Sequence, residues 1–186
     1  MFIDCLQCHL AVCAQKDLPN YGTRDRDFWN LISIREPTRP QIDKNGFLQV
    51  HTSLFHDVAG LEQLDPTIRF ILPSAGHIRE IYNFVDSVSG EPLLIHCWEG
   101  RSRSTAIALA LIVRGMHMDG FTTDEIISEA PELLLAIRRI AVPNHLVLTL
   151  ALEHFLEKET ADSYVTQLLH HPVLFSNRYP GASPAD

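Results

Sequence analysis

Residues 93–113 read LLIHCWEGRSRSTAIALALIV. The stretch opens with three apolar residues, Leu93–Ile95, and such a short, wholly apolar run is typical of a strand buried on both faces of a sheet. It closes with the nearly continuous apolar run TAIALALIV, which favours a buried helix. Polar residues 96–104 join the two runs. The stretch therefore predicts a buried strand, a polar loop and a buried helix, in that order.

The polar loop carries residue types that suit the binding of a tetrahedral anion. Cys97 and Arg103 stand six positions apart, with Gly100 between them. Successive backbone N–H groups in such a loop can point inward, and the N-terminus of the following helix adds unpaired donors and a positive dipole end. Gly100 permits a left-handed turn that a Cβ atom would penalise. The planar guanidinium of Arg103 matches two oxygens of a dianion, so the loop predicts a phosphate-binding cradle.

Cys97 is the candidate nucleophile of this loop. A positive field from a helix N-terminus and a neighbouring cation favours the thiolate form of a cysteine. A thiolate at the floor of a phosphate cradle is placed for in-line attack on phosphorus. Ser104 can donate a hydrogen bond to that sulfur, which makes it a better leaving group in a later step. His96 is expected to position the loop rather than to carry a proton.

Cys-x5-Arg, with His96 before the cysteine and Ser104 after the arginine, is the signature of the cysteine-dependent protein tyrosine phosphatase superfamily. IHCWEGRSRST resembles most closely its dual-specificity and bacterial tyrosine-phosphatase-like branch. The resemblance is dense over residues 93–113 and weaker over residues 31–155. It implies an α/β fold, with a central mixed sheet flanked by helices and the phosphate loop between a central strand and a buried helix. It also implies metal-independent hydrolysis of phosphomonoesters through a phosphocysteine intermediate, without a cofactor.

Two segments outside the loop support the resemblance. Residues 138–144 resemble the family segment that packs behind the phosphate loop, which makes Asn144 a supporting residue. Asp57 resembles the aspartate of the family's mobile loop, and a carboxylic acid that protonates the leaving oxygen accelerates such reactions by ~10²–10⁴-fold. Asp65 lies closer to the family's usual spacing before Cys97, whereas Asp57 directly follows a predicted strand. Asp57 is therefore preferred as the general acid, and Asp65 stays open as the alternative.

The remaining loop positions are candidates for contact with the substrate. They are Trp98, Glu99, Gly100, Arg101 and Ser102, together with Arg103. Trp98, Glu99 and Arg101 could line the rim of the pocket or face solvent. Arg101 would favour acidic or multiply phosphorylated substrates, an effect that Glu99 partly cancels. The expected substrate is a phosphorylated protein, in the first place on tyrosine, or a small phosphomonoester, and phosphate, sulfate or vanadate can occupy the loop.

Two other functions remain open from the sequence. A rhodanese-like sulfurtransferase also presents a cysteine in an anion-binding loop between a strand and a helix, but that class needs no general acid and lacks the Ser104-type continuation. A non-catalytic module could keep the loop only to bind a phosphorylated partner.

Composition narrows the class of protein further. The chain has 186 residues, 46% of them hydrophobic, which suits one domain with a sizeable core. Its net charge of −8, without an obvious basic patch, argues against nucleic acid or an anionic membrane as a partner. No apolar run reaches the roughly 18 residues of a membrane span, and the first residues lack the charged region of a signal peptide. We therefore expect a cytoplasmic protein.

The remaining sequence predicts further strands and helices in a single domain over residues 1–171. Expected strands are residues 1–3, 31–34 and 47–50, the last continuing toward residue 55, and expected helices are residues 72–88, 123–130, 131–140 and 145–159. Residues 172–186 are polar and contain Pro and Gly, which predicts a tail that lies on the surface or is frayed.

Overall fold

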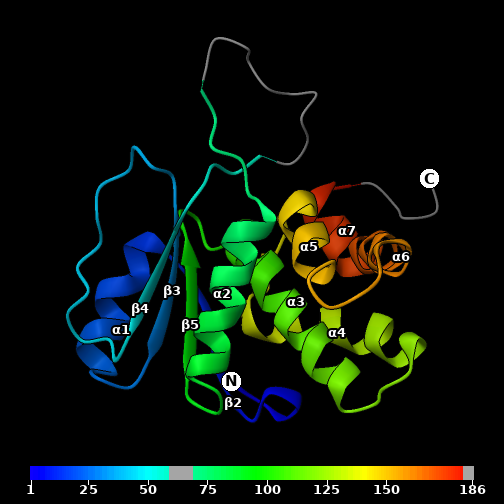
Figure 1. The fold of residues 1–186 in the computed structure, drawn as a ribbon, viewed down its shortest axis with the longest axis horizontal. Coiled ribbons are helices and arrows are strands. Elements are labelled where there is room, and N and C mark those ends of the chain that lie inside the picture. The colour runs from blue at the N-terminus through cyan, green and yellow to red at the C-terminus, as the bar shows by residue number, and fades with distance from the viewer. Residues whose placement is uncertain (59–68, 182–186) are drawn as a thin grey trace.

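A five-stranded mixed sheet runs through the computed structural model, which describes residues 1–58 and 69–181 (Figure 1). The strands are β1 (Phe2–Ile3), β2 (Cys8–Ala14), β3 (Asn30–Arg35), β4 (Val50–Leu54) and β5 (Leu93–Cys97). Their order is β1-β2-β5-β3-β4, and all neighbouring pairs are parallel except β1 and β2. The predicted mixed sheet is confirmed.

Strand β5 occupies the centre of this sheet. Ile95 pairs with Val12 on one side and with Ile32 on the other, and all five residues of β5 are buried. A strand covered on both faces has no solvent-facing positions, which explains why its apolar residues form a run instead of alternating with polar ones. The loop that follows β5 therefore begins in the middle of the sheet, at the edge where the carboxyl ends of the parallel strands meet.

Helices cover both faces of the sheet (Figure 1). On one face α1 (Leu18–Arg24) packs over a small apolar cluster that includes Leu31 and Leu94. The larger core lies on the other face, under α2 (Ala75–Ser87), α3 (Arg103–Met118), α4 (Thr123–Ile137), α5 (His145–Leu152), α6 (Lys158–Leu169) and α7 (Pro172–Arg178). The described residues also include two 3-10 turns, η1 (Asp4–Leu6) and η2 (Gln15–Asp17). No helix among the described residues is long and apolar enough to span a membrane.

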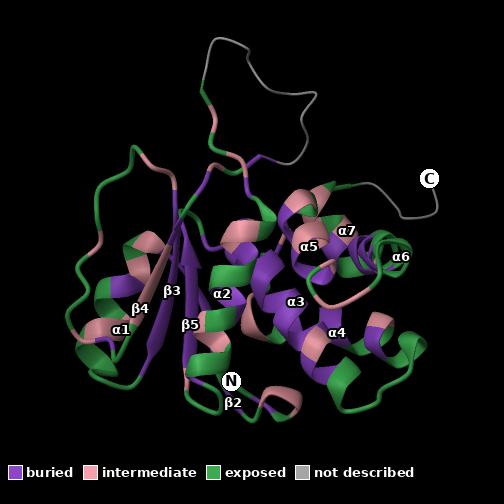
Figure 2. Cartoon of the chain, in the orientation of Figure 1, coloured by how far each residue is buried: buried purple, intermediate pink, exposed green. Residues whose placement is uncertain are grey.

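Helix α3 lies at the centre of the larger core. It is buried on almost every side, as its continuous apolar sequence predicts, and Figure 2 shows it in the same buried colour as β3 and β5. Its N-terminus is fixed directly behind the polar loop that follows β5. The predicted strand, loop and helix of residues 93–113 are thus confirmed.

Several helix and strand boundaries differ from the prediction. Residues 123–140 form one helix to Ile137 instead of two, because Pro131 lies inside α4 while Ile126, Ala130 and Leu134 still bury one continuous face. The predicted last helix is also wrong: it ends at Leu152, and α6 begins only at Lys158. The break carries no Gly or Pro signal; within it, the ring of His154 stacks on that of Tyr82 at 4.6 Å.

The ends of two other segments also needed correction. The strand expected from Phe47 begins at Val50, where pairing with Leu31 of β3 starts. Residues 172–178, expected to belong to a tail, form helix α7, which Leu174 anchors in the core with 1% of its surface exposed. The domain boundary at residue 171 itself stays a prediction.

Candidate active site

Cys97 ends strand β5 and lies at the bottom of the polar loop. Its side chain is buried, and its Sγ lies 3.1 Å from Oγ of Ser104 in the first turn of α3. The strand fixes the cysteine and the helix fixes the serine, so the two side chains meet where the loop closes. The structure therefore places the predicted nucleophile and the predicted hydroxyl donor in direct contact.

Gly100 allows the loop to lie directly on the end of strand β2. Its φ angle is +62°, and a Cβ atom there would overlap the backbone of Cys13. The loop is also tied to the residue after β2, since Gln15 N donates to the carbonyl of Trp98 at 3.2 Å. The glycine is thus needed for two reasons, the left-handed turn and the close approach to β2.

His96 supports the loop from inside the sheet and is neutral. It is fully buried, and burial lowers its pKa to about 4. Nδ1 lies 3.4 Å from the carbonyl oxygen of Cys97, and Nε2 lies 2.7 Å from Oγ of Ser33. A carbonyl oxygen only accepts, so Nδ1 carries the proton and Nε2 accepts from the serine hydroxyl. These contacts fit the predicted role of His96 as a residue that positions the loop.

Arg103 is buried at the start of α3 and faces two carboxylates. Nη1 donates to the carbonyl of Phe55 at 2.8 Å, Nη2 lies 3.6 Å from Oε1 of Glu36, and Nε lies 3.4 Å from Oδ2 of Asp57. Within the described residues, no acceptor completes a hydrogen bond to the buried Nε. The guanidinium is therefore held rigidly and keeps donor capacity for an anion in the loop.

Asp57 reaches the loop from the end of strand β4. Its Oδ1 accepts hydrogen bonds from Oγ of Ser102 at 2.7 Å and from Nδ2 of Asn144 at 2.8 Å. The same amide donates to the carbonyl of Val58 at 3.1 Å. The structure thus brings Asp57, Ser102, Arg103 and Asn144 together. Asp65 lies outside the described residues.

Residues 138–144, which we call the strap, run behind the loop and bind its backbone. Arg138 donates from Nε to the carbonyl of Gly100 at 2.9 Å and from Nη2 to that of Glu99 at 3.1 Å. The strap backbone adds two further bonds, from Val142 N to the carbonyl of Arg101 at 2.8 Å and from Asn144 N to that of Ser102 at 3.3 Å. These contacts fix the carbonyls on the outside of the loop and leave its inner face to other groups.

The rim of the loop contains two residues that sequence reasoning missed. The guanidinium of Arg39 lies 4.0 Å from the ring centroid of Trp98, and its Nε lies 3.1 Å from Oε2 of Glu36. Glu36 thus links Arg39 to Arg103. Its position directly after β3 was a usable signal, because the carboxyl ends of parallel strands gather at one edge of the sheet. Arg39 gave no such signal.

Trp98, Glu99 and Arg101 are exposed positions of the loop, and Nη2 of Arg101 donates to the carbonyl of Asn177 at 2.9 Å. A hollow of about 390 Å³ adjoins them, lined by Ala14, Lys16, Trp98, Glu99, Arg138 and Ile140. The predicted contacts of Trp98, Glu99 and Arg101 with a substrate remain predictions.

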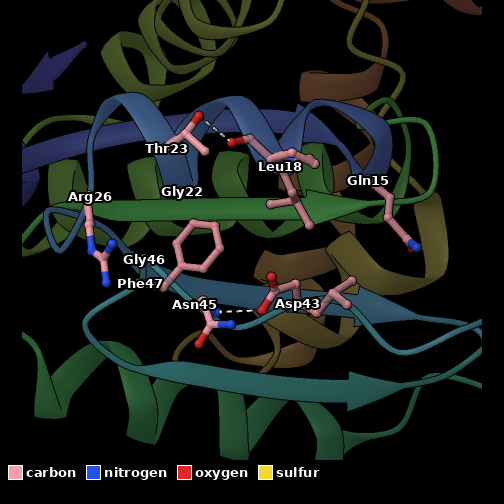
Figure 3. A pocket seen from close by; sticks show the side chains of 11 residues that line it. Gln15, Leu18, Gly22, Thr23, Arg26, Asp43, Asn45, Gly46 and Phe47 are labelled. Carbon is pink, nitrogen blue, oxygen red and sulfur yellow. Dashed lines mark hydrogen bonds between the residues drawn. The ribbon is translucent and has the colours of Figure 1, made fainter.

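A separate cavity of about 390 Å³ lies between α1 and residues 42–47 (Figure 3). Leu18 and Phe47 contribute its apolar surface, and Asp43 accepts a hydrogen bond from Asn45 N at 2.9 Å. No residue of the loop lines it. The cavity is therefore distinct from the site around Cys97.

Comparison with known proteins agrees with this arrangement. No family model matches the chain. Dual specificity protein phosphatase 15 of Mus musculus is 29% identical over 117 residues, which are 62% of this chain and 41% of that protein. The chain thus spans about two fifths of the length of this curated relative. Human DUSP28 has a similar fold, with a TM-score of 0.54 and 17% identity over 83% of this chain and 94% of that one.

The loop signature and the curated relative thus point to the cysteine-dependent protein tyrosine phosphatase superfamily, and the solved structures show a shared fold. A second solved structure with this fold is PTPMT1 in complex with PI(5)P, with a TM-score of 0.51 and 16% identity over 86% of this chain and 94% of that one. A third is a mouse putative dual specificity phosphatase complexed with zinc tungstate, with a TM-score of 0.51 and 19% identity over 81% of this chain and 84% of that one. The predicted fold is therefore confirmed, and the similarity to dual specificity protein phosphatase 15 agrees with the resemblance that the loop sequence shows.

Proposed function

We propose that this protein is a cysteine-dependent phosphatase that hydrolyses phosphomonoesters, in the first place phosphotyrosine of proteins. The observation that carries the proposal is the position of Asp57, which stands 40 residues before Cys97 yet contacts both Ser102 and Arg103 of the loop. A sulfurtransferase or a phosphate-binding module needs no carboxyl group there. A phosphatase does, because an alkoxide or phenoxide is a poor leaving group unless it is protonated.

In the first step the thiolate of Cys97 attacks phosphorus, the S–P bond forms and the P–O bond to the leaving group breaks. Protonated Asp57 gives its proton to the departing oxygen. Inward N–H groups of the loop and the guanidinium of Arg103 hold the three remaining phosphoryl oxygens, on which charge is spread in the transition state. When substrate binds, its phosphoryl group therefore takes the place that the carboxylates of Glu36 and Asp57 occupy beside the guanidinium of Arg103.

In the second step water attacks the phosphocysteine, the S–P bond breaks and inorganic phosphate leaves. Asp57, now ionised, takes a proton from the water. The hydroxyl of Ser104, 3.1 Å from the sulfur, donates to the thiolate as it departs. The neutral ring of His96 holds the loop throughout both steps and exchanges no proton.

Several features support a phosphorylated protein as the substrate class. The loop contains no lysine, which makes a specialised phosphoinositide or inositol-phosphate role less favoured. Trp98 is exposed beside the nucleophile and offers an aromatic surface to a phenyl ring. Phosphate, sulfate or vanadate would occupy the same cradle as the phosphoryl group. A cytoplasmic location remains the prediction from the sequence.

Hydrolysis of para-nitrophenyl phosphate by the wild type and by Cys97→Ser tests the proposal, with a chelator present and vanadate as competitor. We expect chelator-resistant, vanadate-inhibited turnover that disappears in the variant. If the well-folded wild-type protein bound vanadate but showed no turnover, the protein would be a phosphate-binding module instead of an enzyme. Transfer of sulfur from thiosulfate to cyanide, without phosphatase activity, would establish the sulfurtransferase.

A further inference from the structure

Helix α7 packs against α6 near the end of the described chain (Figure 1). The side chain of Leu174 is buried in the core. The last turn of α7 lies against the strap. Nδ2 of Asn177 donates to the carbonyls of Arg139 at 2.8 Å and Ala141 at 3.0 Å. Nη2 of Arg178 donates to the carbonyl of Pro143. The end of α7 therefore binds three carbonyl groups of the strap.

The bond from Asn177 to the carbonyl of Ala141 also orients the neighbouring N–H of Val142, which binds the phosphate loop. The carbonyl of Ala141 and the N–H of Val142 belong to the same peptide unit, which is planar, so fixing the direction of one fixes the direction of the other. Asn177 holds that carbonyl, and Val142 N donates to the carbonyl of Arg101 at 2.8 Å. The amide of Asn177 thus aims the donor that binds the loop.

Arg101 links the loop directly back to helix α7. Its Nη2 donates to the backbone carbonyl of Asn177 at 2.9 Å. Hydrogen bonds therefore run from α7 to the strap, from the strap to the loop and from the loop to α7. The side chain of Asn177 supplies two of them and lies outside the cradle itself.

We propose that Asn177 is a positioning residue for the phosphate loop, acting through the Ala141–Val142 peptide; this inference rests on the proposed function. Donors that point at the phosphoryl oxygens before substrate binds need no reorganisation during the reaction, and they are effective only while the loop backbone keeps its orientation. The two donors of an amide are what the site requires. A carboxylate would place negative charge against two carbonyl oxygens.

Asn177→Asp tests this role, because it keeps the shape of the side chain and removes both donors. Ser176→Ala is the matched control, since Ser176 lies in the same turn and, among the described residues, its Oγ bonds only to the carbonyl of Pro172 in α7, at 2.8 Å. We expect Asn177→Asp to bind orthovanadate about tenfold more weakly, as expected for the loss of one or two hydrogen bonds. Its kcat/KM on para-nitrophenyl phosphate should fall by a similar factor. Ser176→Ala should change neither quantity, whatever it does to thermal stability.

Asn177→Gln supplies the second variant, because it retains the amide on a longer side chain. We expect it to lose less vanadate affinity than Asn177→Asp, and it remains measurable if the aspartate variant does not fold. Wild-type affinity in a folded Asn177→Asp, or equal losses in the amide and carboxylate variants, would overturn the proposal. Calorimetric titration with orthovanadate needs no turnover. An inactive wild type that binds vanadate would therefore contradict the proposed catalysis while still testing Asn177.

Discussion

Nδ2 of Asn144 donates to Oδ1 of Asp57 at 2.8 Å, across 87 positions of sequence. Oδ1 of the same amide accepts a hydrogen bond from Val147 N at 3.0 Å and so caps helix α5. Asn144 is 3% exposed, which leaves its side chain little freedom to move. The start of a core helix therefore sets the position of the carboxyl group proposed as the general acid.

Asn144→Ser separates these two roles of the amide. Serine is a good N-cap residue, so the helix should keep nearly all of its stability, whereas the shorter side chain cannot donate to Asp57. We expect kcat/KM for alkyl phosphates, which reports the steps up to release of the leaving group, to fall about tenfold, with little change for activated aryl phosphates, whose leaving groups need no proton. Steady-state rates on a series of leaving groups, with thermal unfolding in parallel, measure both effects. Equal losses of kcat/KM on every substrate would contradict a role through the acid function of Asp57.

Asp57→Ala should give the same dependence on the leaving group in stronger form. Removal of a positioned general acid costs typically ~10²–10⁴-fold, and the cost grows as the leaving group becomes more basic. The slope of log kcat/KM against leaving-group pKa should therefore steepen in Asp57→Ala and stay at the wild-type value in Asp65→Ala. The reverse result would transfer the assignment to Asp65.

His96 makes the stability of the fold depend on pH. Its pKa falls from 6.5 in the unfolded chain to about 4 in the folded one, because burial disfavours the charged ring. The unfolded state therefore binds more protons between these values, and stability present above pH 6.5 is lost as the pH falls toward 4. The loss amounts to about 3 kcal/mol at full extent. Urea unfolding at pH 7.5 and pH 4.5 should show a smaller difference in His96→Asn than in the wild type.

The sequence predicted the strand, loop and helix of residues 93–113 because the two apolar runs and the spaced polar residues between them lie in one continuous stretch. The apolar runs on either side are continuous, so the burial of β5 on both faces and of α3 could be inferred from the residues themselves. Contacts between segments that are distant in sequence could not be predicted in this way. Glu36 and Asn177 reach the site only after the sheet and the helices are assembled. The break between α5 and α6 likewise depends on tertiary packing, since residues 153–157 contain neither Gly nor Pro.

A comparison of Gly100 with Gly90 separates the two reasons for which a position needs glycine, namely a positive φ angle and the lack of space for a Cβ atom. Both have positive φ, +62° and +81°, but a Cβ atom at Gly90 would meet nothing within 4 Å, whereas one at Gly100 would overlap the backbone of Cys13. Gly90→Ala should therefore lose only the roughly 1–2 kcal/mol of a left-handed alanine and bind vanadate like the wild type.

Gly100→Ala should lose more stability than Gly90→Ala, because the loop must also move away from β2. The carbonyls of Glu99 and Gly100 would then shift relative to Arg138, which binds both. We expect vanadate affinity to fall by at least tenfold, since the loop donors no longer converge on one anion. Chemical unfolding and vanadate titration of the two variants measure the strain and the displacement separately. If Gly100→Ala bound vanadate as tightly as Gly90→Ala, the shape of the cradle would not depend on the close packing of the loop against Cys13.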